Sequence, residues 1–498
     1  MSRPSKSSAV WQPEDLRKAA GVSRDLTLLL LASVTAFFLL LGSPPATKSQ
    51  ELRVLETARE MDERGEYMVP YFRGNRRFEK PPLAYWLALA GYRLVGSVNE
   101  WSGRLYSAAA GTATVLLVYA FSRTLGRPRT GLWAGLILAT SLLFVQSARR
   151  AEIDVLLTSA TTAAIYAGWR ALGDSSHAGS RSLLWVHLAW LAMATAVLAK
   201  GPAGLSFPFA VLAAYLACKR QWRDFRLLLY PSAVLLFLAV ALPWFLVVAH
   251  KEDLSVDVFA REMNTAMGGV NHGKEGLVYA WFFYLIRVWY DFAPWSLLLV
   301  PAVASAIKHL SSERGFLLVW AGSILFLLEF VGNKQPHYFL PAFPALSLLV
   351  GWWLESKAPS LRFLPQRWPW ACAATVVAIS LLVTALLAVT GWEQRQKRSS
   401  CREFARTILP LVGNEPVYAY PRNIAAMDFY LGRVVALIPD HLKNADSASE
   451  RFFLIAYGTE EDLSRPETAS LLSSSRFLPV HTALPSEAPL RLYRSRLP

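Results

Sequence analysis

Long apolar blocks separated by short charged stretches constrain this chain of 498 residues more than any other feature. Each block is roughly 15 to 27 residues long, which is the length that an α-helix needs to cross a bilayer. Only 17% of the residues are charged, whereas a soluble domain carries about 25% and needs them at its surface. We therefore expect a mostly α, polytopic membrane protein.

The pattern predicts about eleven transmembrane helices. They cover approximately residues 26–41, 105–122, 131–147, 152–169, 183–199, 204–218, 227–249, 281–307, 315–332, 338–354 and 370–391. The apolar stretch from Leu83 to Val95 is short for a span, so we expect it to lie along the membrane surface. If it does cross the membrane, the count rises to about twelve or thirteen.

Basic residues in the short loops predict the orientation. Lysines and arginines cluster in alternate loops, at 123–129, 219–226, 308–314 and 357–367. If 83–95 does not span, these clusters share one side with the basic N-terminus, and the positive-inside rule assigns that side to the cytoplasm. The net charge of +15 then reflects lipid phosphates at the membrane surface, and we expect no nucleic-acid partner.

The same orientation divides the chain into three parts. Residues 1–24 form a cytoplasmic segment, and residues 25–391 form a transmembrane domain with outer-face loops at 43–104 and 250–280. Residues 392–498 form a small soluble α/β domain on the outer, periplasmic side. In that domain, strand-like segments lie at 417–420, 434–438, 452–457 and 490–493, and helix-like segments lie at 402–411, 423–431 and 459–473.

Ionisable residues gather on the predicted outer face. Apolar residues recur at every third position from Leu52 to Met61, which predicts an amphipathic surface helix with Glu51 and Arg53 near its start. Lys80 precedes two prolines that fix an extended backbone, and its compact charge suits a phosphate. The alternative for each of these residues is an ordinary solvated or interfacial charge.

Three further polar positions interrupt apolar segments on the same side. Asp154 lies at an apolar helix start, where a carboxylate is costly and usually functional, the alternative being an acid that faces the lipid headgroups. Lys200 and His337 each lie beside a proline-broken turn, and Tyr338 follows His337 directly. Because all these residues fall on one face, we expect them to share one site.

The outer loop 250–280 adds Glu262 and His272 as candidate cavity or acceptor-binding residues. Its Gly268-Gly269 pair predicts a mobile segment that gates the acceptor. A zinc site is the alternative for the histidine and the carboxylates, but the sequence contains neither an HExxH motif nor a close histidine pair.

In combination, these motifs resemble the bacterial lipid A aminoarabinose transferases and, more broadly, the membrane glycosyltransferases of the dolichyl-phosphate-mannose protein mannosyltransferase type, which have the GT-C fold. The matching pieces are 51–61, 78–83, Asp154, 200–202 and 337–345, in family order. The resemblance implies an enzyme that takes a sugar from a polyprenyl-phosphate donor, such as an undecaprenyl phosphate, and delivers it on the outer face.

The resemblance also implies roles for the polar residues. The donor phosphate would be bound by Arg53, Lys80, Lys200 and His337. The catalytic carboxylates would be Glu51 and Asp154, and Glu79 and Tyr338 would line the cavity. A divalent metal held by Glu79 and Asp154 is the one cofactor that the resemblance allows.

One departure from the family pattern concerns Gln50. The family usually has an Asp-Glu pair in this loop, and Gln50 stands in the place of the aspartate that is taken as the catalytic base. Either Glu51 serves instead, or the acceptor differs, or the chain is impaired. A polyprenyl phosphate leaves readily once its charge is stabilised, and an ionised phosphate acceptor needs no base, so one carboxylate can suffice.

We therefore expect a monomeric, inverting hexosyl or pentosyl transferase of the cell inner membrane, acting in lipid A modification or on another lipid or glycan acceptor. A transporter or flippase of a lipid-linked substrate is one alternative. It would place ionisable residues at mid-bilayer and show internal repeats, and the sequence shows no such repeat. A non-catalytic relative of the same fold is the other alternative, which Gln50 keeps open.

Overall fold

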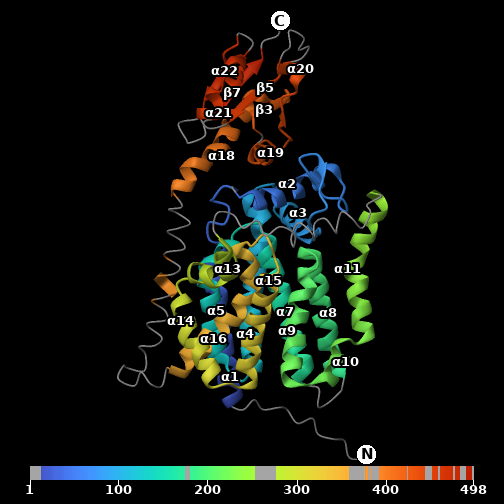
Figure 1. The fold of residues 1–498 in the computed structure, drawn as a ribbon. Helices are drawn as coiled ribbons and strands as arrows, with labels where there is room; N and C mark the ends of the chain where they lie inside the picture. Colours follow the sequence, from blue (N-terminus) through green and yellow to red (C-terminus); the bar gives the residue numbers. More distant parts are fainter. Residues whose placement is uncertain are drawn as a thin grey trace, which may run out of the picture.

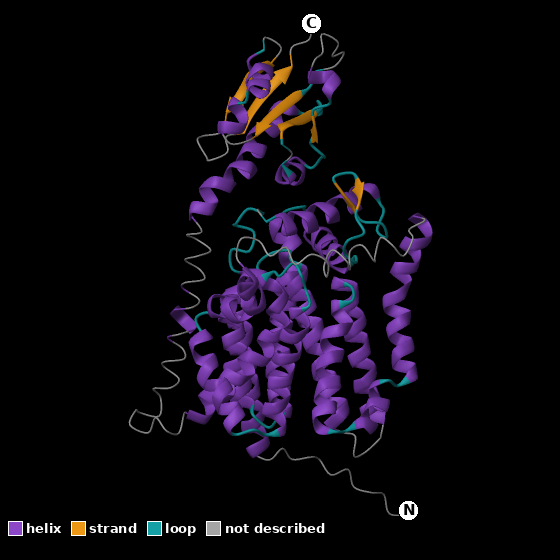
Figure 2. Ribbon diagram, in the orientation of Figure 1, coloured by secondary structure: helices purple, strands orange, loops and turns teal. Residues whose placement is uncertain are grey.

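Figure 1 shows the fold of the chain in a computed structural model. In the helical part, the structure describes residues 13–46, 48–173, 180–252 and 276–357. In the C-terminal part, it describes residues 392–422, 424–443, 451–457, 460–474, 477–482 and 490–495, and between the two parts only positions 375, 377–379 and 382. The described residues form a helical bundle with a strand-containing domain at one end (Figure 2).

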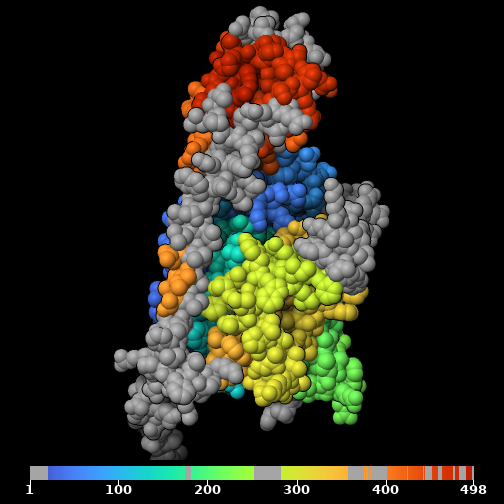
Figure 3. All heavy atoms as spheres, turned by 60° about the vertical axis from the view of Figure 1, so that its left-hand side comes forward, coloured from blue at the N-terminus to red at the C-terminus, as the bar shows by residue number. Residues whose placement is uncertain are grey.

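The bundle consists of helices, and its long ones run back and forth along one axis (Figure 1). The helices of the bundle are α1 (Pro13–Ser33) with the π-helical turn η1 (Val34–Phe38), α4 (Glu100–Thr124), α5 (Pro128–Thr140), α6 (Leu142–Ala148), α7 (Ile153–Gly173), α8 (Ser180–Lys200), α9 (Ala203–Lys219), α10 (Phe225–Leu228), α11 (Pro231–Glu252), α13 (Gly276–Asp291), α14 (Ser296–Lys308), α15 (Ser312–Glu329), the 3₁₀ segment η3 (Pro336–Ala342) and α16 (Phe343–Lys357). Helix α7 packs along α8, and α5 packs between α4 and α16. Figure 3 shows α13 and α14, in yellow-green to yellow, on the flank of the bundle.

Five of the described helices are long and apolar enough to cross a membrane, and a sixth span arises if α5 and α6, bent by 69°, count as one. This finding confirms a multi-pass membrane protein, whereas the count of about eleven spans remains a prediction. Helices α9 and α14 fall short of the length because they contain 17 and 13 residues. The predicted span 370–391 lies almost wholly outside the described residues.

Aromatic rings hold the centre of the bundle together. Phe121 on α4 stacks on Phe316 of α15 with ring centroids 5.9 Å apart, and Trp169 of α7 lies 4.4 Å from the same Phe316 ring. Trp320, one turn further along α15, is fully buried. Such ring pairs add specific stacking energy to the burial of large apolar surfaces.

A small layer of structure covers one end of the bundle. It contains α2 (Ser49–Arg64), the hairpin β1 (Tyr71–Phe72) and β2 (Asn75–Arg76), and α3 (Leu83–Val95). The predicted helix is present as α2, its apolar positions Leu52, Leu55, Ala58 and Met61 are buried, and it ends before Gly65, which adopts φ +65°. It is not a surface helix, however, because the polar residues Glu56, Thr57 and Arg59 on its other side are at most 7% exposed. Helix α3 lies beside α2 at this end and packs against it and α4, as expected for a helix that does not span (Figure 1).

The C-terminal part is a small α/β domain, as predicted. It opens with α18 (Trp392–Val412) and contains a five-stranded sheet in the order β4 (Ala436–Leu437), β3 (Val417–Pro421), β5 (Phe453–Tyr457), β7 (Leu490–Ser495) and β6 (Phe477–Thr482). The first three of these are parallel, and β7 pairs antiparallel with β5 and β6. The helices α19 (Ala425–Leu431), α20 (Asp440–Lys443), α21 (Glu460–Ser464) and α22 (Pro466–Ser473) complete it.

Two details of this domain differ from the predicted elements. Strand β6 was not predicted, because Pro479 interrupts its pattern; as an edge strand it tolerates a residue that cannot donate a backbone hydrogen bond. The helix expected at 459–473 is divided into α21 and α22, since Pro466 begins the second helix.

The C-terminal domain docks on the covering layer through α19. Arg73 of the hairpin turn lies with Nε 2.5 Å from Oδ2 of Asp428, and the hydroxyl of Tyr430 donates to Glu100 at the start of α4 over 2.9 Å. Arg402 of α18 also pairs with Glu100 at 3.3 Å. These buried or half-buried polar contacts fix the domain above the end of the bundle that holds the polar pocket described next.

Candidate active site

A polar pocket opens at the end of the bundle beneath α2. It is lined by Gln50, Arg53, Val54, Arg77, Lys80, Tyr85, Glu152, Ile153, Asp154, Lys200, His337 and Tyr338. These residues come from α2, from the segment before and within α3, from the start of α7, from the end of α8 and from η3. The structure thus brings together the six predicted residues Arg53, Lys80, Asp154, Lys200, His337 and Tyr338, which are far apart in the sequence.

Asp154 and Lys200 form the inner wall of the pocket. Lys200 Nζ donates to Oδ1 of Asp154, and Nε2 of His337 lies 3.7 Å from Oδ2 of the same carboxylate. The Lys200 ammonium also lies 4.0 Å from the centre of the Tyr338 ring, within the range of a cation–π contact. Each of the four side chains is therefore held by another member of the group.

Local backbone features place Lys200 and His337 at this wall. Lys200 is the last residue of α8, where Gly201 adopts φ +64° and ends the helix. A Cβ on Gly204 would approach the backbone of Ala196 to 2.1 Å, so the turn into α9 requires glycine there. Pro336 opens η3 and sets the backbone of His337. The glycine and proline turns noted in the sequence therefore direct these two side chains into the pocket.

The outer wall of the pocket is cationic. Arg53 on α2, Arg77 and Lys80 face the same space, and Arg77 donates to the hydroxyl of Tyr85 over 3.2 Å. Burial raises the pKa of the Tyr85 phenol, which therefore stays a neutral hydrogen-bonding group at physiological pH. Together with Lys200, four cations line the pocket against two carboxylates, so the net charge of the lining favours an anion.

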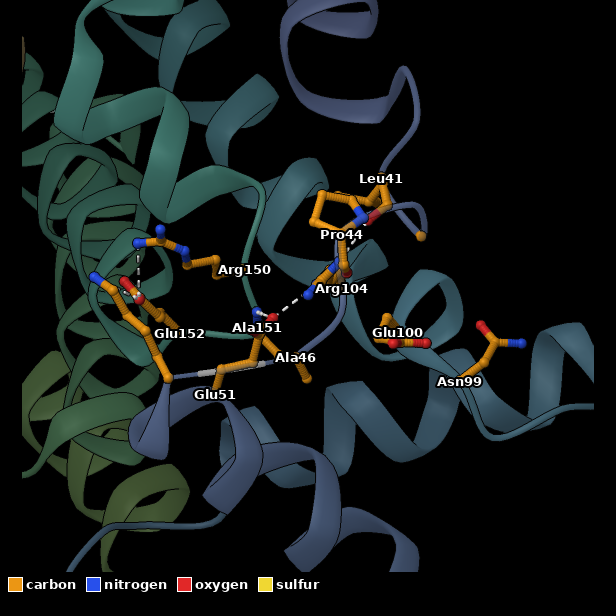
Figure 4. Close-up of polar contacts among 12 residues, drawn as sticks. Leu41, Pro44, Ala46, Glu51, Asn99, Glu100, Arg104, Arg150, Ala151 and Glu152 are labelled. Carbon is orange, nitrogen blue, oxygen red and sulfur yellow. Dashed lines mark hydrogen bonds and ion pairs between the residues drawn. The ribbon is translucent and has the colours of Figure 1, made fainter. Parts of the chain in front are cut away.

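Glu51 lies outside the pocket, and its predicted catalytic role is revised. Successive helical residues are about 100° apart, so Gln50, Arg53 and Val54 share the face of α2 toward the pocket and Glu51 is turned away from it. Its side chain is 2% exposed and pairs with Arg104 of α4, with Oε1 2.7 Å from Nε (Figure 4). In this position the Glu51 carboxylate does not line the pocket that Gln50 faces.

Glu79 also lies outside the pocket lining, on the surface. Its carboxylate is 47% exposed and lies 2.5 Å from Nη1 of Arg77, so it orients a pocket cation rather than lining the cavity. The described residues contain no group of three or more His, Cys, Asp and Glu side chains able to hold a metal ion. The resemblance allowed a divalent metal held by Glu79 and Asp154. The Asp154 carboxylate is already paired with Lys200, so these two side chains do not fit the oxygen ligands that such an ion requires.

Glu152 is a pocket residue that the sequence analysis did not single out. It lies just before α7, is 3% exposed, and has Lys48 and Arg150 at 3.9 and 3.8 Å. Its position two residues before Asp154 was the available signal. The remaining two candidates, Glu262 and His272, lie in 253–275, outside the described residues, so their predicted role at the acceptor stays a prediction.

Comparison with known proteins agrees with this fold. Residues 27–253 match the family model of dolichyl-phosphate-mannose-protein mannosyltransferases. The structure matches that of ArnT from Cupriavidus metallidurans bound to undecaprenyl phosphate over 94% of this chain and 97% of that one, with a TM-score of 0.77 and 20% identity. It also matches the archaeal oligosaccharyltransferase AglB from Archaeoglobus fulgidus over 88% of this chain and 69% of that one, with a TM-score of 0.53 and 13% identity. The chain therefore has the GT-C fold of these membrane proteins.

Proteins of similar sequence identify the group of membrane proteins that this chain resembles. An undecaprenyl phosphate-alpha-4-amino-4-deoxy-L-arabinose arabinosyl transferase of Pseudomonas paraeruginosa is 32% identical over 65% of this chain, and an uncharacterised protein of Aquifex aeolicus is 30% identical over 66% of it. The matched region spans 58% and 64% of these relatives' own lengths. The resemblance predicted from the sequence is thus confirmed: the chain is similar to the aminoarabinose transferases and shares the GT-C fold.

Proposed function

We propose that the protein is a glycosyltransferase that moves a sugar from a polyprenyl-phosphate donor to an envelope acceptor. The observation that carries the proposal is the pocket itself, in which Arg53, Arg77, Lys80 and Lys200 converge from separate segments on one small space. Fixed cations of this kind stabilise the charge that a departing phosphate develops, without reorganising during the reaction.

The proposed reaction is a single displacement at the anomeric carbon. An oxygen of the acceptor forms the new bond as the bond from carbon to phosphate oxygen breaks, and the polyprenyl phosphate leaves with the electron pair. Arg53 and Lys80 bind the phosphate, and Asp154 holds Lys200 toward it. Attack from the side opposite the leaving group inverts the anomeric configuration, and no general acid is required.

Gln50 favours an acceptor that is already ionised. Gln50 faces the pocket but cannot take a proton, while Asp154 is engaged by Lys200 and Glu152 is buried beside Lys48 and Arg150. An acceptor phosphate, as on a lipid A-like glycolipid, attacks without a base. A hydroxyl acceptor would need one, at a rate gain of about 10²–10⁴ for a well-placed base. Phosphate acceptors are therefore the first to test, with 4-amino-4-deoxy-L-arabinose as the first pentose and hexoses as the comparison.

The orientation follows from the basic loops. The described chain begins with α1 at the end opposite the C-terminal domain, where α10, which contains Arg226 and follows Arg223, also lies (Figure 1). If that end faces the cytoplasm, as the positive-inside rule predicts, the pocket opens on the outer side of the inner membrane. We propose that the protein acts there as a monomer, with the pocket of a single chain as the complete site.

The transporter alternative receives no support from the comparisons. The ionisable residues of the pocket come from α2 and from the adjoining ends of α7 and α8, at one end of the bundle and not midway along it (Figure 1).

The alternative of a non-catalytic relative is decided by experiment. Purified protein in lipid nanodiscs is incubated with undecaprenyl-phosphate sugars and either lipid A or hydroxyl acceptors, and products are measured by mass spectrometry. We expect transfer by the wild type and by Arg223→Ala, an exposed control at the opposite end, and at least tenfold slower transfer by Asp154→Asn. A wild type no faster than Asp154→Asn with every donor would refute the proposal.

A further inference from the structure

The contacts of Glu51 suggest how the pocket keeps its shape. Oε1 of Glu51 accepts two hydrogen bonds, from Nε of Arg104 over 2.7 Å and from the backbone N–H of Ala151 over 3.2 Å (Figure 4). Ala151 belongs to the short loop 149–152 that joins α6 to α7 and lies three residues before Asp154. One carboxylate oxygen therefore links α2 and α4 to the loop that begins the Asp154 helix.

Arg104 extends this link to a further segment. Its Nη1 donates to the carbonyl oxygens of Leu41 and Pro44, each over 2.7 Å, so the guanidinium joins α4 to the chain that leads from η1 into α2 (Figure 4). Its side chain is 2% exposed, as is that of Glu51. Because water cannot replace these buried partners, the geometry of the four segments depends on both charges being present.

The loop has other supports as well, and one of them also reaches α2: Glu152 pairs at 3.9 Å with Lys48, the residue just before that helix, whose side chain is 46% exposed. Arg149 donates to the carbonyl of Ala36 over 2.9 Å, and Ser147 donates to Glu152 over a long 3.3 Å. The hydrogen bond from Ala151 N–H to Glu51 joins the backbone of the loop to α2, the helix that carries Arg53 and Gln50. Glu51 is thus the buried link between the two walls of the pocket, beside the longer and half-exposed pair of Lys48 with Glu152.

We propose that Glu51, paired with Arg104, is a positioning residue that holds the 149–152 loop and thereby sets the place of Asp154 relative to Arg53. This inference rests on the proposed function only in taking Asp154 and Arg53 as parts of one site. Glu51 does not line the pocket, so its effect on the reaction passes through the loop.

Hydrogen exchange measured by mass spectrometry tests the inference, with Glu51→Gln compared with Glu56→Gln. Glu56 is a matched control because it also lies buried on α2 in an ion pair, with Arg59 over 2.7 Å, but that pair does not contact the loop. We expect Glu51→Gln to raise amide exchange in 149–154 by about tenfold or more, because a buried charged hydrogen-bond partner of the loop is weakened. Glu56→Gln should leave exchange in that segment as in the wild type.

Binding and transfer give a second readout. Since Arg53 and Lys80 lie outside the loop, the Kd of Glu51→Gln for undecaprenyl phosphate should change less than about threefold, while its transfer rate falls about tenfold or more. Unchanged exchange in 149–154 for Glu51→Gln, or an equal rise for Glu56→Gln, would overturn the inference. If Glu51→Gln does not fold, Glu51→Asp, which keeps the charge on a shorter side chain, must raise exchange in 149–154 for the inference to stand.

The exchange and binding measurements do not require turnover. A wild type that transfers no sugar would therefore refute the proposed function, yet the exchange of 149–154 would still decide whether Glu51 holds the loop. A fall in transfer rate with unchanged exchange would instead show that Glu51 acts directly, against the positioning role.

Discussion

Lys200 and Asp154 form an ion pair across the pocket, in which Lys200 Nζ donates to Oδ1 of the carboxylate. The Lys200 and Asp154 side chains are 14% and 4% exposed, so the attraction between the two charges offsets the free energy that each loses on leaving water. The pair joins the end of α8 to the start of α7, and its ammonium is shared with the Tyr338 ring. The inner wall of the site is thus also a structural contact between helices.

This pair predicts non-additive effects on stability. Asp154→Asn and Lys200→Met each leave one buried charge without its partner, and each should lower the free energy of unfolding by about 3–5 kcal/mol. The double variant removes both charges, so its loss should be smaller than the sum by about 1–3 kcal/mol. Reversible unfolding in mixed micelles measures the three values. Strict additivity would show that the pair contributes no coupling.

Arg53→Ala should weaken binding of undecaprenyl phosphate. Loss of a hydrogen bond to a charged group costs about 1.5–3 kcal/mol, which is roughly a tenfold to hundredfold rise in Kd. Native mass spectrometry or a fluorescence titration in nanodiscs measures it. Arg223→Ala, an exposed arginine at the opposite end of the bundle, serves as the control and should bind as the wild type does. An equal Kd for both variants would place the phosphate elsewhere.

Gln50→Asp restores a carboxylate to the pocket face of α2. The added negative charge should weaken binding of the donor phosphate severalfold. It also offers a base, and transfer to hydroxyl acceptors should rise relative to transfer to phosphate acceptors. The ratio of the two products, measured in one competition assay, is the readout. A ratio equal to that of the wild type would mean that Gln50 does not influence the choice of acceptor.

Much of this site could be predicted from the sequence, because its residues lie at helix ends that local signals mark. The turn prolines and glycines around Lys200 and His337 identified positions that the structure brings to one pocket. The direction of Glu51 could not be predicted in the same way, since polar residues occupy several faces of α2 near its start and only the tertiary partner Arg104 decides which face is buried. The apolar spacing from Leu52 to Met61 predicted one packed side of α2, but the burial of Arg59 on the other side depends on a tertiary partner, the carbonyl of Gly432.

The fold shows the same division between local and tertiary information. Short apolar segments were enough to place β3, β5 and β7. Strand β6 was missed because Pro479 is compatible only with a sheet edge, and edges are set by the topology. The docking of the C-terminal domain was not predicted either. It depends on pairs such as Arg73 with Asp428, whose members are more than 350 residues apart in the chain.

Asp428 predicts a pH dependence of stability. Burial raises the pKa of this carboxyl to about 7, even though it accepts a hydrogen bond from Val435 N–H over 2.8 Å and faces Arg73. The folded protein therefore binds a proton more tightly at this site than the unfolded chain, whose aspartates titrate near pH 4. The protonated Asp428 carboxyl therefore contributes fully to the free energy of unfolding below about pH 4, and this contribution is lost as the pH rises toward about 7.

Asp428→Asn should remove this dependence, because the amide oxygen can still accept the Val435 hydrogen bond but the side chain cannot ionise. Thermal unfolding of the full chain at pH 5, 6, 7 and 8 measures the effect. We expect the Tm of the wild type to fall more steeply from pH 5 to 7 than that of Asp428→Asn. Parallel curves would show that Asp428 titrates as it does in the unfolded chain.

The central claim is that the pocket between Arg53, Lys80 and Lys200 receives the phosphate of a polyprenyl-phosphate donor. An experimental structure of the protein with undecaprenyl phosphate, determined by cryo-electron microscopy in nanodiscs, tests it most directly. We predict phosphate density within hydrogen-bonding distance of Arg53 and Lys80, on the same side of α2 as Gln50. Phosphate density at any other place, with this pocket unchanged, would contradict the account.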